Sequence, residues 1–173
     1  MITTALFLPK RDARYVLWNK HSTHDRVQRR LPVGGRVEAT DASVFEAAAR
    51  EAQEESGLTP ILVETVLLAV VENIHRDRVF MNRRMFWFLG MFHGLPRAYP
   101  EEGMLDPRAY TLREMPVGEM WEADARWLVP VLSAYERAPT TPVYYRRFTH
   151  ERGVIVQESP LGPVPMLLPV FPF

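Results

Sequence analysis

The chain of 173 residues contains no cysteine, which excludes a disulfide framework and thiol chemistry. It has no run of about 18 apolar residues that would span a bilayer, and its first residues offer no signal-peptide cleavage site. Basic and acidic side chains number 21 each, which argues against broad electrostatic binding to nucleic acid or membranes. We therefore expect a cytoplasmic protein whose partners include neither a membrane nor a nucleic acid polymer.

The composition is that of a globular protein, with 47% apolar and 24% charged residues. We expect one domain over residues 1–158. Five of the 15 prolines lie in the last 15 residues, 159–173, and this density excludes a helix or a central strand there. We expect this apolar tail to pack along its own domain or a neighbour's, which leaves a monomer and a homodimer both open.

The pattern of apolar residues and turn residues predicts a mixed sheet and two helices, an α/β helix–sheet–helix sandwich. The second helix is expected within residues 115–135, where Pro130 kinks or divides it. Residues 94–107 are expected to form a loop. Strands are predicted at residues 2–8, 14–19, 61–72, 79–92, 110–113, 143–148 and 154–158.

The stretch from Leu31 to Pro60 contains a Gly pair, a short acidic loop and an alanine-rich segment. We predict that the first helix runs from about Ser43 to Ser56. Ser43 or Asp41 can cap its start, and Gly57 can supply the left-handed residue that ends it. We expect the rest of the chain to support this stretch.

Three carboxylates of this helix, Glu51, Glu54 and Glu55, stand at i, i+3 and i+4 and therefore reach one patch of its surface. Like charges repel there, and they lie near the negative end of the helix dipole. A hard divalent cation such as Mg²⁺ or Mn²⁺ would compensate the repulsion. The alternative is a solvated acidic face on which Arg50 pairs with Glu54 or Glu46.

The residues around this patch resemble the Nudix box, G-x5-E-x7-R-E-U-x-E-E-x-G-U, where U is a bulky apolar residue. Residues 50–58 read REAQEESGL and match its second half, with Ala52 smaller than usual. In the first half, Asp41 replaces the family Glu, and eight residues rather than seven separate it from Arg50. A similar extension is found in coenzyme A pyrophosphatases of the same family.

The resemblance implies the Nudix fold and a Mg²⁺ or Mn²⁺ site. Glu51, Glu54 and Glu55 would hold the cation together with a carbonyl of the Gly pair, which we assign to Gly34. Glu51, Glu54 and Arg50 would form the catalytic group, in which Arg50 orients a glutamate by a charge-assisted hydrogen bond.

Nudix enzymes often bring an additional glutamate to the metals from the region that corresponds to residues 94–107. Glu101 or Glu102 fits that role, and two solvated surface acids are the alternative. The general base is either a box glutamate or one of this pair.

Residues 20–30 form a basic polar segment that precedes the Gly pair. Next to a site that processes phosphate these side chains would contact phosphate, and a solvated loop is the alternative. We do not expect His21 or His24 to bind metal. The basic residues are Lys20, Arg26, Arg29 and Arg30, of which Arg26 is our substrate-binding candidate.

Residues 112–132 resemble the part of MutT-type triphosphatases that reads oxidised purines. Trp121 would stack on the base and Asp124 would accept its N–H donors, whereas a core tryptophan with Asp124 as helix cap is the alternative. The family's Asp pair is reduced here to Ala123 and Asp124, and its Asn before the Gly pair is Leu31. At helical spacing one face would carry Val117, Trp121, Asp124, Leu128 and Val131.

Three functions follow from these residues and resemblances. The first is hydrolysis of a purine nucleoside triphosphate, similar to 8-oxo-dGTP, to the monophosphate and pyrophosphate. The second is a Nudix pyrophosphatase for coenzyme A or another nucleoside diphosphate derivative. The third is a catalytically silent Nudix domain that binds a nucleotide.

Overall fold

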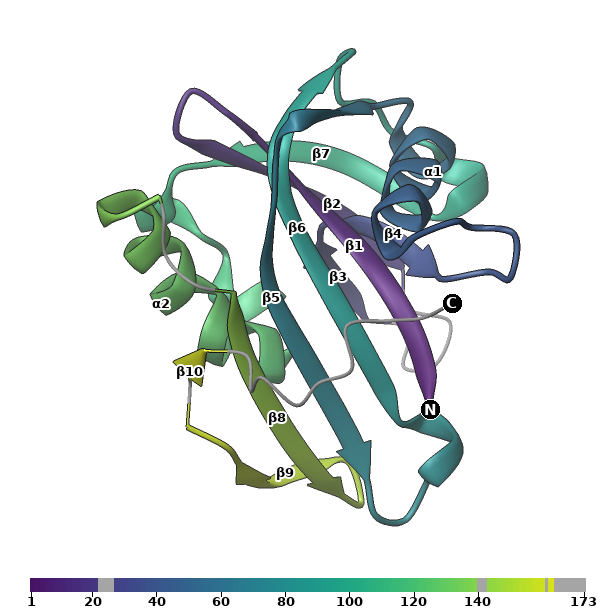
Figure 1. Ribbon diagram of the computed structural model, residues 1–173, viewed down its shortest axis with the longest axis vertical. Coiled ribbons are helices and arrows are strands. Elements are labelled where there is room, and N and C mark those ends of the chain that lie inside the picture. Colours follow the sequence, from purple (N-terminus) through teal and green to yellow (C-terminus); the bar gives the residue numbers. More distant parts are fainter. Residues whose placement is uncertain (22–26, 140–142, 161, 164–173) are drawn as a thin grey trace.

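The computed structural model of the protein describes residues 1–21, 27–139, 143–160 and 162–163. A mixed sheet forms its centre, and the long strands β5, β6 and β8 run side by side through it (Figure 1). The helices are α1 (Val44–Ser56) and α2 (Glu122–Arg137). The strands are β1 (Ile2–Arg11), β2 (Arg14–His21), β3 (Gln28–Leu31), β4 (Val33–Arg36), β5 (Thr59–His75), β6 (Arg83–His93), β7 (Met104–Tyr110), β8 (Tyr144–Glu151), β9 (Val154–Glu158) and β10 (Gly162–Pro163).

The sheet follows the order β10-β8-β5-β6-β1-β2-β3, with β4, β7 and β9 paired to β1, β2 and β8. The pairs β1–β6 and β5–β8 are parallel, and the other pairs are antiparallel. Strand β1 has two antiparallel partners: residues 4–7 pair with β4, and Lys10 and Arg11 pair with β2. The strand that carries the Gly pair therefore lies directly beside β1.

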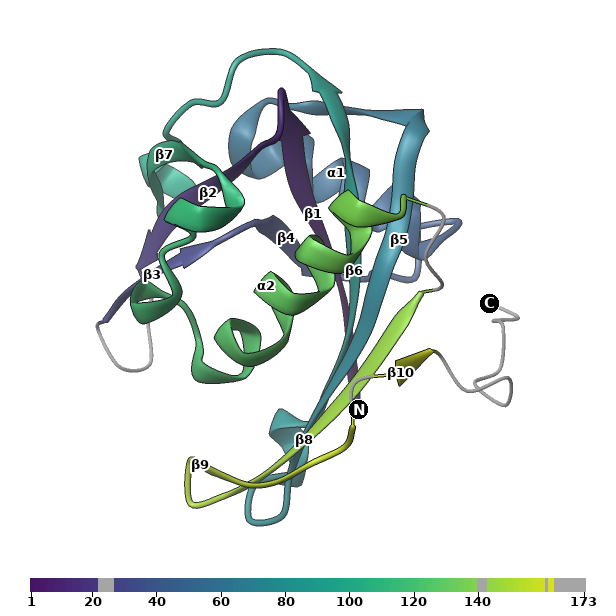
Figure 2. The same ribbon diagram turned by 90° about the vertical axis from the view of Figure 1, so that its left-hand side faces the viewer.

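The two helices cover opposite faces of the sheet, as Figure 2 shows. Side chains alternate along β1 accordingly, because successive residues of a strand point to opposite faces. Ala5 and Phe7 belong to the core beside α1, and Leu6 and Leu8 belong to the core beside α2. The predicted helix–mixed sheet–helix sandwich is confirmed.

Helix α1 begins and ends as predicted. The Ser43 side chain accepts a hydrogen bond from the Glu46 N–H at 3.1 Å, and Gly57 closes the helix at a φ of 67°. Ala47, Ala48 and Ala52 are fully buried. These small side chains let α1 lie close to β1 and β4, so the small residue in the middle of the box is explained by packing.

Several strand predictions are wrong in their bounds. The strand predicted at residues 79–92 begins only at Arg83, because Val79–Met81 form a 3-10 turn, and the end of the predicted basic loop belongs to β3. Strand β1 continues past Pro9 because the chain changes partners there: Pro9 is the last residue paired with β6, and Lys10 already pairs with β2. The strand expected at residues 110–113 comes earlier, as β7, within the predicted loop. Residues 112–114 instead form a 3-10 turn, which Thr111 and Glu114 close through a capping box.

Helix α2 is continuous through Pro130 and begins only after Trp121. Leu128 and Val131 are buried on it as predicted, but Val117 lies in a separate 3-10 turn and is exposed. Trp121 itself has an extended backbone before the helix and is partly exposed, so the predicted stripe is wrong at its first two positions. Among the described residues, no helix combines the length and apolarity needed to cross a membrane.

The predicted hairpin near the end of the chain is present as β8 and β9. The tail begins with β10, where Gly162 and Pro163 pair with Tyr145 and Tyr144 of β8. The prediction that the rest of the tail packs on a surface concerns residues 164–173, which lie outside the described residues.

Candidate functional site

The Gly pair on β4 packs against α1 and β1. A Cβ atom on Gly35 would lie 2.4 Å from Oε2 of Glu51, and one on Gly34 would lie 2.4 Å from the carbonyl oxygen of Ala5. Gly34 also has a φ of 148°, which glycine adopts at little cost. The glycines are therefore required because the carboxylates of α1 and the backbone of β1 approach β4 closely.

Arg50 is the centre of the carboxylate patch. Its Nε and Nη2 donate to the two oxygens of Asp41 at 3.0 and 3.1 Å. Its Nη1 donates to Oε1 of Glu51 and to Oε2 of Glu54, both at 3.0 Å. Nη2 also donates to the carbonyl oxygen of Arg36 at 3.0 Å. One guanidinium thus fixes two box glutamates and the loop that precedes the helix.

Asp41 and the box glutamates Glu51 and Glu54 bind different nitrogen atoms of the Arg50 guanidinium. Its side chain is almost fully buried, and it accepts a further hydrogen bond from the Glu38 N–H at 2.7 Å. The Arg50 guanidinium holds the pKa of Asp41 below its usual value. Asp41 therefore anchors Arg50 from the loop that precedes the helix.

Glu55 is the most buried of the three box glutamates. Its Oε2 accepts the Gly34 N–H at 2.8 Å, and its Oε1 accepts a hydrogen bond from the Lys20 ammonium. Burial raises the pKa of Glu51, and the Arg50 guanidinium opposes that shift. The Glu54 side chain is half-exposed. The three carboxylates therefore share one end of α1 but differ in their surroundings.

The side chains fit a hard divalent cation, because they are carboxylates. In the described part of the chain, no group of three acidic or histidine side chains already has the arrangement of a metal site. The hydrogen bonds explain this, since Arg50 holds Glu51 and Glu54 while Lys20 holds Glu55. A cation bound here would share these carboxylates with the basic side chains that contact them.

Glu101 and Glu102 lie on an exposed 3-10 turn formed by Pro100–Glu102. The preceding residue, Tyr99, brings its hydroxyl close to Gly57, where a Cβ would lie 2.4 Å from it. The turn thus follows a residue that contacts the same end of α1 that carries Glu54 and Glu55.

The basic segment divides into residues with different surroundings. Arg30 is buried and pairs with Asp106 at 2.6 Å and with Glu119 at 3.3 Å, so its guanidinium is not placed to contact phosphate. Arg29 stacks over the Trp121 ring with its guanidinium carbon 4.3 Å from the ring centroid. Arg26 and His24, and the side chain of His21, lie outside the described residues.

Trp121 and Asp124 stand at the start of α2. The Trp121 side chain is 40% exposed, whereas Asp124 is 5% exposed. Asp124 accepts a hydrogen bond from Nε1 of Trp127 at 3.4 Å, and burial raises its pKa to about 7. No side chain caps α2. The alternative of a core tryptophan with Asp124 as helix cap is therefore wrong, because Trp121 is partly exposed and Asp124 does not cap the helix.

Two buried polar atoms near this helix were not identified from the sequence. Nε1 of Trp87 and Oγ1 of Thr4 have no hydrogen-bond partner among the described residues. The Trp87 ring packs edge-on against Trp127, with the centroids 4.9 Å apart. Thr4 pairs with Met85, two residues before Trp87 on β6. The burial of both atoms depends on the pairing of β1 with β6, which joins residues far apart in the sequence.

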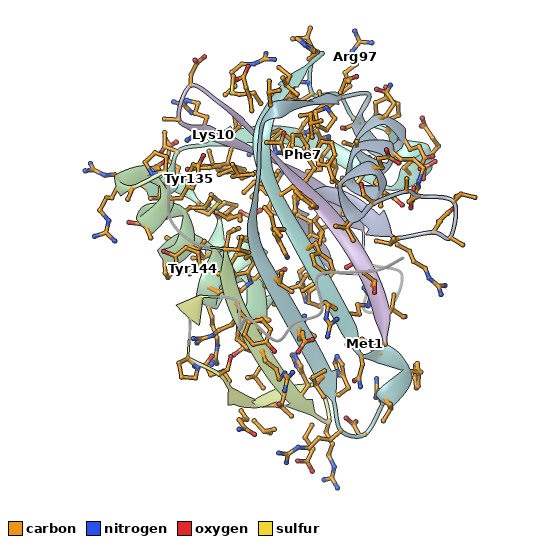
Figure 3. All side chains as sticks on the ribbon, viewed as in Figure 1. Met1, Phe7, Lys10, Arg97, Tyr135 and Tyr144 are labelled. Carbon is orange, nitrogen blue, oxygen red and sulfur yellow. The ribbon has the colours of Figure 1, made fainter. Side chains whose placement is uncertain are left out.

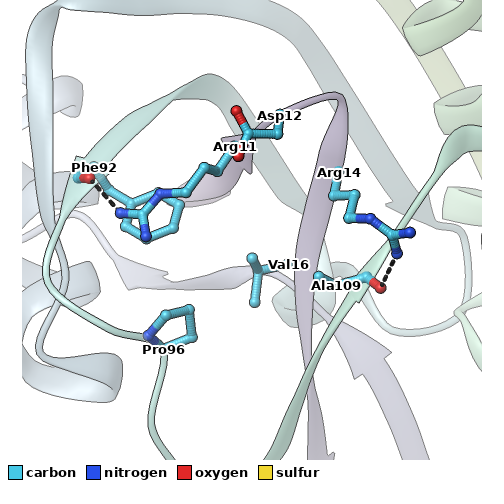
Figure 4. A pocket seen from close by; sticks show the side chains of 7 residues that line it. All are labelled: Arg11, Asp12, Arg14, Val16, Phe92, Pro96 and Ala109. Carbon is cyan, nitrogen blue, oxygen red and sulfur yellow. Dashed lines mark hydrogen bonds between the residues drawn. The ribbon is translucent and has the colours of Figure 1, made fainter.

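A hollow of about 310 Å³ lies beside the β1–β2 turn (Figure 4). Arg11 stacks on the Phe92 ring at 4.3 Å and donates to the Phe92 carbonyl oxygen at 3.0 Å. No residue that the sequence singled out lines this hollow, so it is distinct from the carboxylate patch. Its lining consists of Arg11, Asp12, Arg14, Val16, Phe92, Pro96 and Ala109.

The fold and the box on α1 are those of the Nudix hydrolase family. The family model for the NUDIX domain matches residues 2–130, and the chain belongs to this family. Nudix hydrolases act on small nucleotide substrates and generally use divalent metals such as Mg²⁺. A search of curated proteins returned no match.

Several solved structures share the fold. The mutator MutT protein from Bacillus halodurans has a TM-score of 0.73 at 17% identity, with 95% of this chain and 100% of that chain covered. A MutT NUDIX hydrolase from Burkholderia pseudomallei has a TM-score of 0.63 at 21% identity, with 76% and 97% covered. A protein described as an ADP compounds hydrolase has a TM-score of 0.61 at 16% identity, with 80% and 74% covered. At these identities the likeness establishes the fold and does not identify the substrate.

The contacts of Asp41 predict the effect of removing it. Asp41→Ala should lower kcat by roughly 10- to 100-fold, because outer partners that orient a site have effects of that size. Arg50 would lose the acid that anchors it and would hold Glu51 and Glu54 less firmly. Steady-state kinetics with saturating Mg²⁺ measure the change.

Glu38→Ala is the matched control, because this exposed acid lies in the same loop and meets Asp41 through its backbone N–H. The control should retain wild-type kcat. Wild-type kcat in Asp41→Ala would show that the first half of the box is only a loop in this protein.

Proposed function

We propose that the protein is a Mg²⁺- or Mn²⁺-dependent Nudix hydrolase that cleaves a phosphoanhydride bond. The preferred substrate is a purine nucleoside triphosphate similar to 8-oxo-dGTP, cleaved to the monophosphate and pyrophosphate. In this proposal the substrate is a small nucleotide, and the protein works in the cytoplasm. The observation that carries the proposal is the gathering of Glu51, Glu54 and Glu55 at one end of α1, around Arg50 and against β4.

The residues that would hold the cation are Glu51, Glu54, Glu55 and the carbonyl of Gly34. When bound, the cation supplies positive charge that neutralises phosphate oxygens and lowers the pKa of a water molecule. Arg50 fixes Glu51 and Glu54 through its Nη1, so both carboxylates keep their positions when substrate enters. Either a box glutamate or one of Glu101 and Glu102 accepts the proton of the attacking water.

The start of α2 supports a purine as the base. Trp121 offers a partly exposed indole, and Arg29 on that ring adds a cation beside it. Asp124 is buried one turn further along, and its pKa of about 7 leaves it divided between a neutral and an ionised form near neutral pH. Such a carboxyl group can exchange hydrogen bonds with a purine edge. Arg26 remains a proposed phosphate contact.

The second candidate function is that of a pyrophosphatase for coenzyme A or another nucleoside diphosphate derivative. Two observations favour it: the loop before Arg50 has the one-residue extension seen in coenzyme A pyrophosphatases, and an ADP compounds hydrolase shares the fold. The departures at Ala123 and Leu31 also weaken the case for selectivity toward oxidised purines. A catalytically silent domain has no comparable support, because all three box glutamates are present.

The proposal predicts the effect of Glu54→Gln. This variant should lower kcat by at least about 10²-fold, because it removes one negative charge from the metal site. The fold should be intact, since Glu54 is half-exposed and Arg50 keeps its bonds to Asp41 and Glu51. The assay is a panel of nucleoside triphosphates, diphosphate derivatives and coenzyme A with Mg²⁺, scored for pyrophosphate, phosphate and nucleotide.

Glu46→Gln is the control on the same helix, because Glu46 faces the Ala42 N–H at the other end of α1 and an amide oxygen can accept the same bond. It should retain activity. Wild-type turnover of Glu54→Gln at saturating Mg²⁺ would overturn the catalytic proposal, and the products of the wild-type panel decide between the two substrate classes.

The proposed contacts of Trp121 and Asp124 with the base predict that variants of these residues differ in substrate specificity. Asp124→Asn and Trp121→Ala should each change the ratio of kcat/KM between purine and pyrimidine triphosphates by roughly tenfold or more. Glu122→Gln is the control, since Glu122 lies in the same helical turn but is exposed and pairs with Arg126. A ratio that neither variant changes would exclude the nucleobase pocket and favour a diphosphate derivative as substrate.

A further inference from the structure

Glu55 has both carboxylate oxygens occupied in the metal-free protein. The Gly34 N–H donates to Oε2 at 2.8 Å, and the Lys20 ammonium donates to Oε1. The Lys20 side chain is 31% exposed, whereas that of Glu55 is only 8% exposed. A charge buried to this degree is stable only with a partner, and Lys20 supplies the opposite charge. A cation that binds Glu55 through Oε1 must therefore replace the ammonium.

The two basic groups of the patch differ in how firmly they are held. Arg50 is anchored by two hydrogen bonds to Asp41 and one to the Arg36 carbonyl oxygen, so it cannot leave without breaking the loop contacts. Lys20 reaches Glu55 from strand β2 on a flexible stem of four carbons. Its backbone is fixed by pairing with Arg29 and Met104 on both sides, and only its side chain has to move.

We propose that Lys20 is a displaceable counter-ion of Glu55. It neutralises the buried carboxylate while the divalent cation is absent, and the cation displaces it on binding. Lys20 is thus a positioning residue that keeps Glu55 in place for the metal and lowers the affinity for that metal. This inference rests on the proposed function, because it takes Glu55 to be a ligand of the cation.

The sequence allows a direct observation of the displacement, because the chain has only two lysines, Lys10 and Lys20. Lys10 lies against aromatic rings, with its Nζ 5.7 Å from the Tyr15 ring centroid and 5.4 Å from that of Tyr135 (Figure 3). Wild-type protein carrying lysine labelled with ¹³C at Cε should give one NMR signal from each. Addition of Mg²⁺ should shift the Lys20 signal and leave the Lys10 signal unchanged.

The affinity for Mn²⁺, measured without substrate by the loss of the free-ion EPR signal, tests the competition. Lys20→Met should bind Mn²⁺ roughly two- to fivefold more tightly than wild type, the range expected when a partly exposed ion pair no longer competes. Lys20→Arg keeps a competing cation and should bind less tightly than Lys20→Met. Lys10→Met is the matched control and should bind as wild type does.

Glu55→Gln distinguishes a failure of the proposed metal site from a failure of the proposed Lys20 displacement. If this variant binds Mn²⁺ as tightly as wild type, Glu55 is not a ligand, and both the metal site and the role of Lys20 fall. If Glu55→Gln weakens binding while Lys20→Met leaves it unchanged or weaker, the metal site stands and the displacement is wrong. A Lys20 signal that does not respond to saturating Mg²⁺ overturns the displacement in the same way.

Discussion

The bidentate pair between Arg50 and Asp41 is the interaction on which the candidate site depends. It fixes a guanidinium beside Glu51 and Glu54, whose charges would otherwise repel across one turn of α1. The same guanidinium bonds to the Arg36 carbonyl oxygen and so ties the loop to the strand that carries the Gly pair. The metal-free protein can therefore keep these carboxylates together, because one guanidinium lies between them and reduces their mutual repulsion.

Local chemistry explains which parts of the fold the sequence predicted well. The start and end of α1 depend on Ser43 and Gly57, which act on the adjacent backbone and can be read directly from the chain. The end of β1 depends instead on a change of partner at Pro9, and the position of β7 depends on its pairing with β2. Such pairings join residues far apart in sequence, and the local pattern does not contain them.

In the candidate site, too, the sequence predicted what local spacing decides and missed contacts between residues from different strands. The box predicted which carboxylates share a face, because helical spacing alone decides that. It did not predict that Arg29 and Arg30 have different partners, although neighbouring residues of a strand point to opposite faces. Arg29 stacks on Trp121, and Arg30 enters a buried pair with Asp106. The partner of Glu55 was also missed, since Lys20 comes from another strand.

The central claim is that the carboxylates at one end of α1 form a divalent cation site. The most direct measurement is the shift in melting temperature on addition of Mg²⁺ to wild type and to a variant in which Glu51, Glu54 and Glu55 are all changed to Gln. Ligand binding to the folded state alone raises the melting temperature. The account predicts a shift of several degrees for wild type and none for the folded triple variant. An equal shift in both proteins would contradict it.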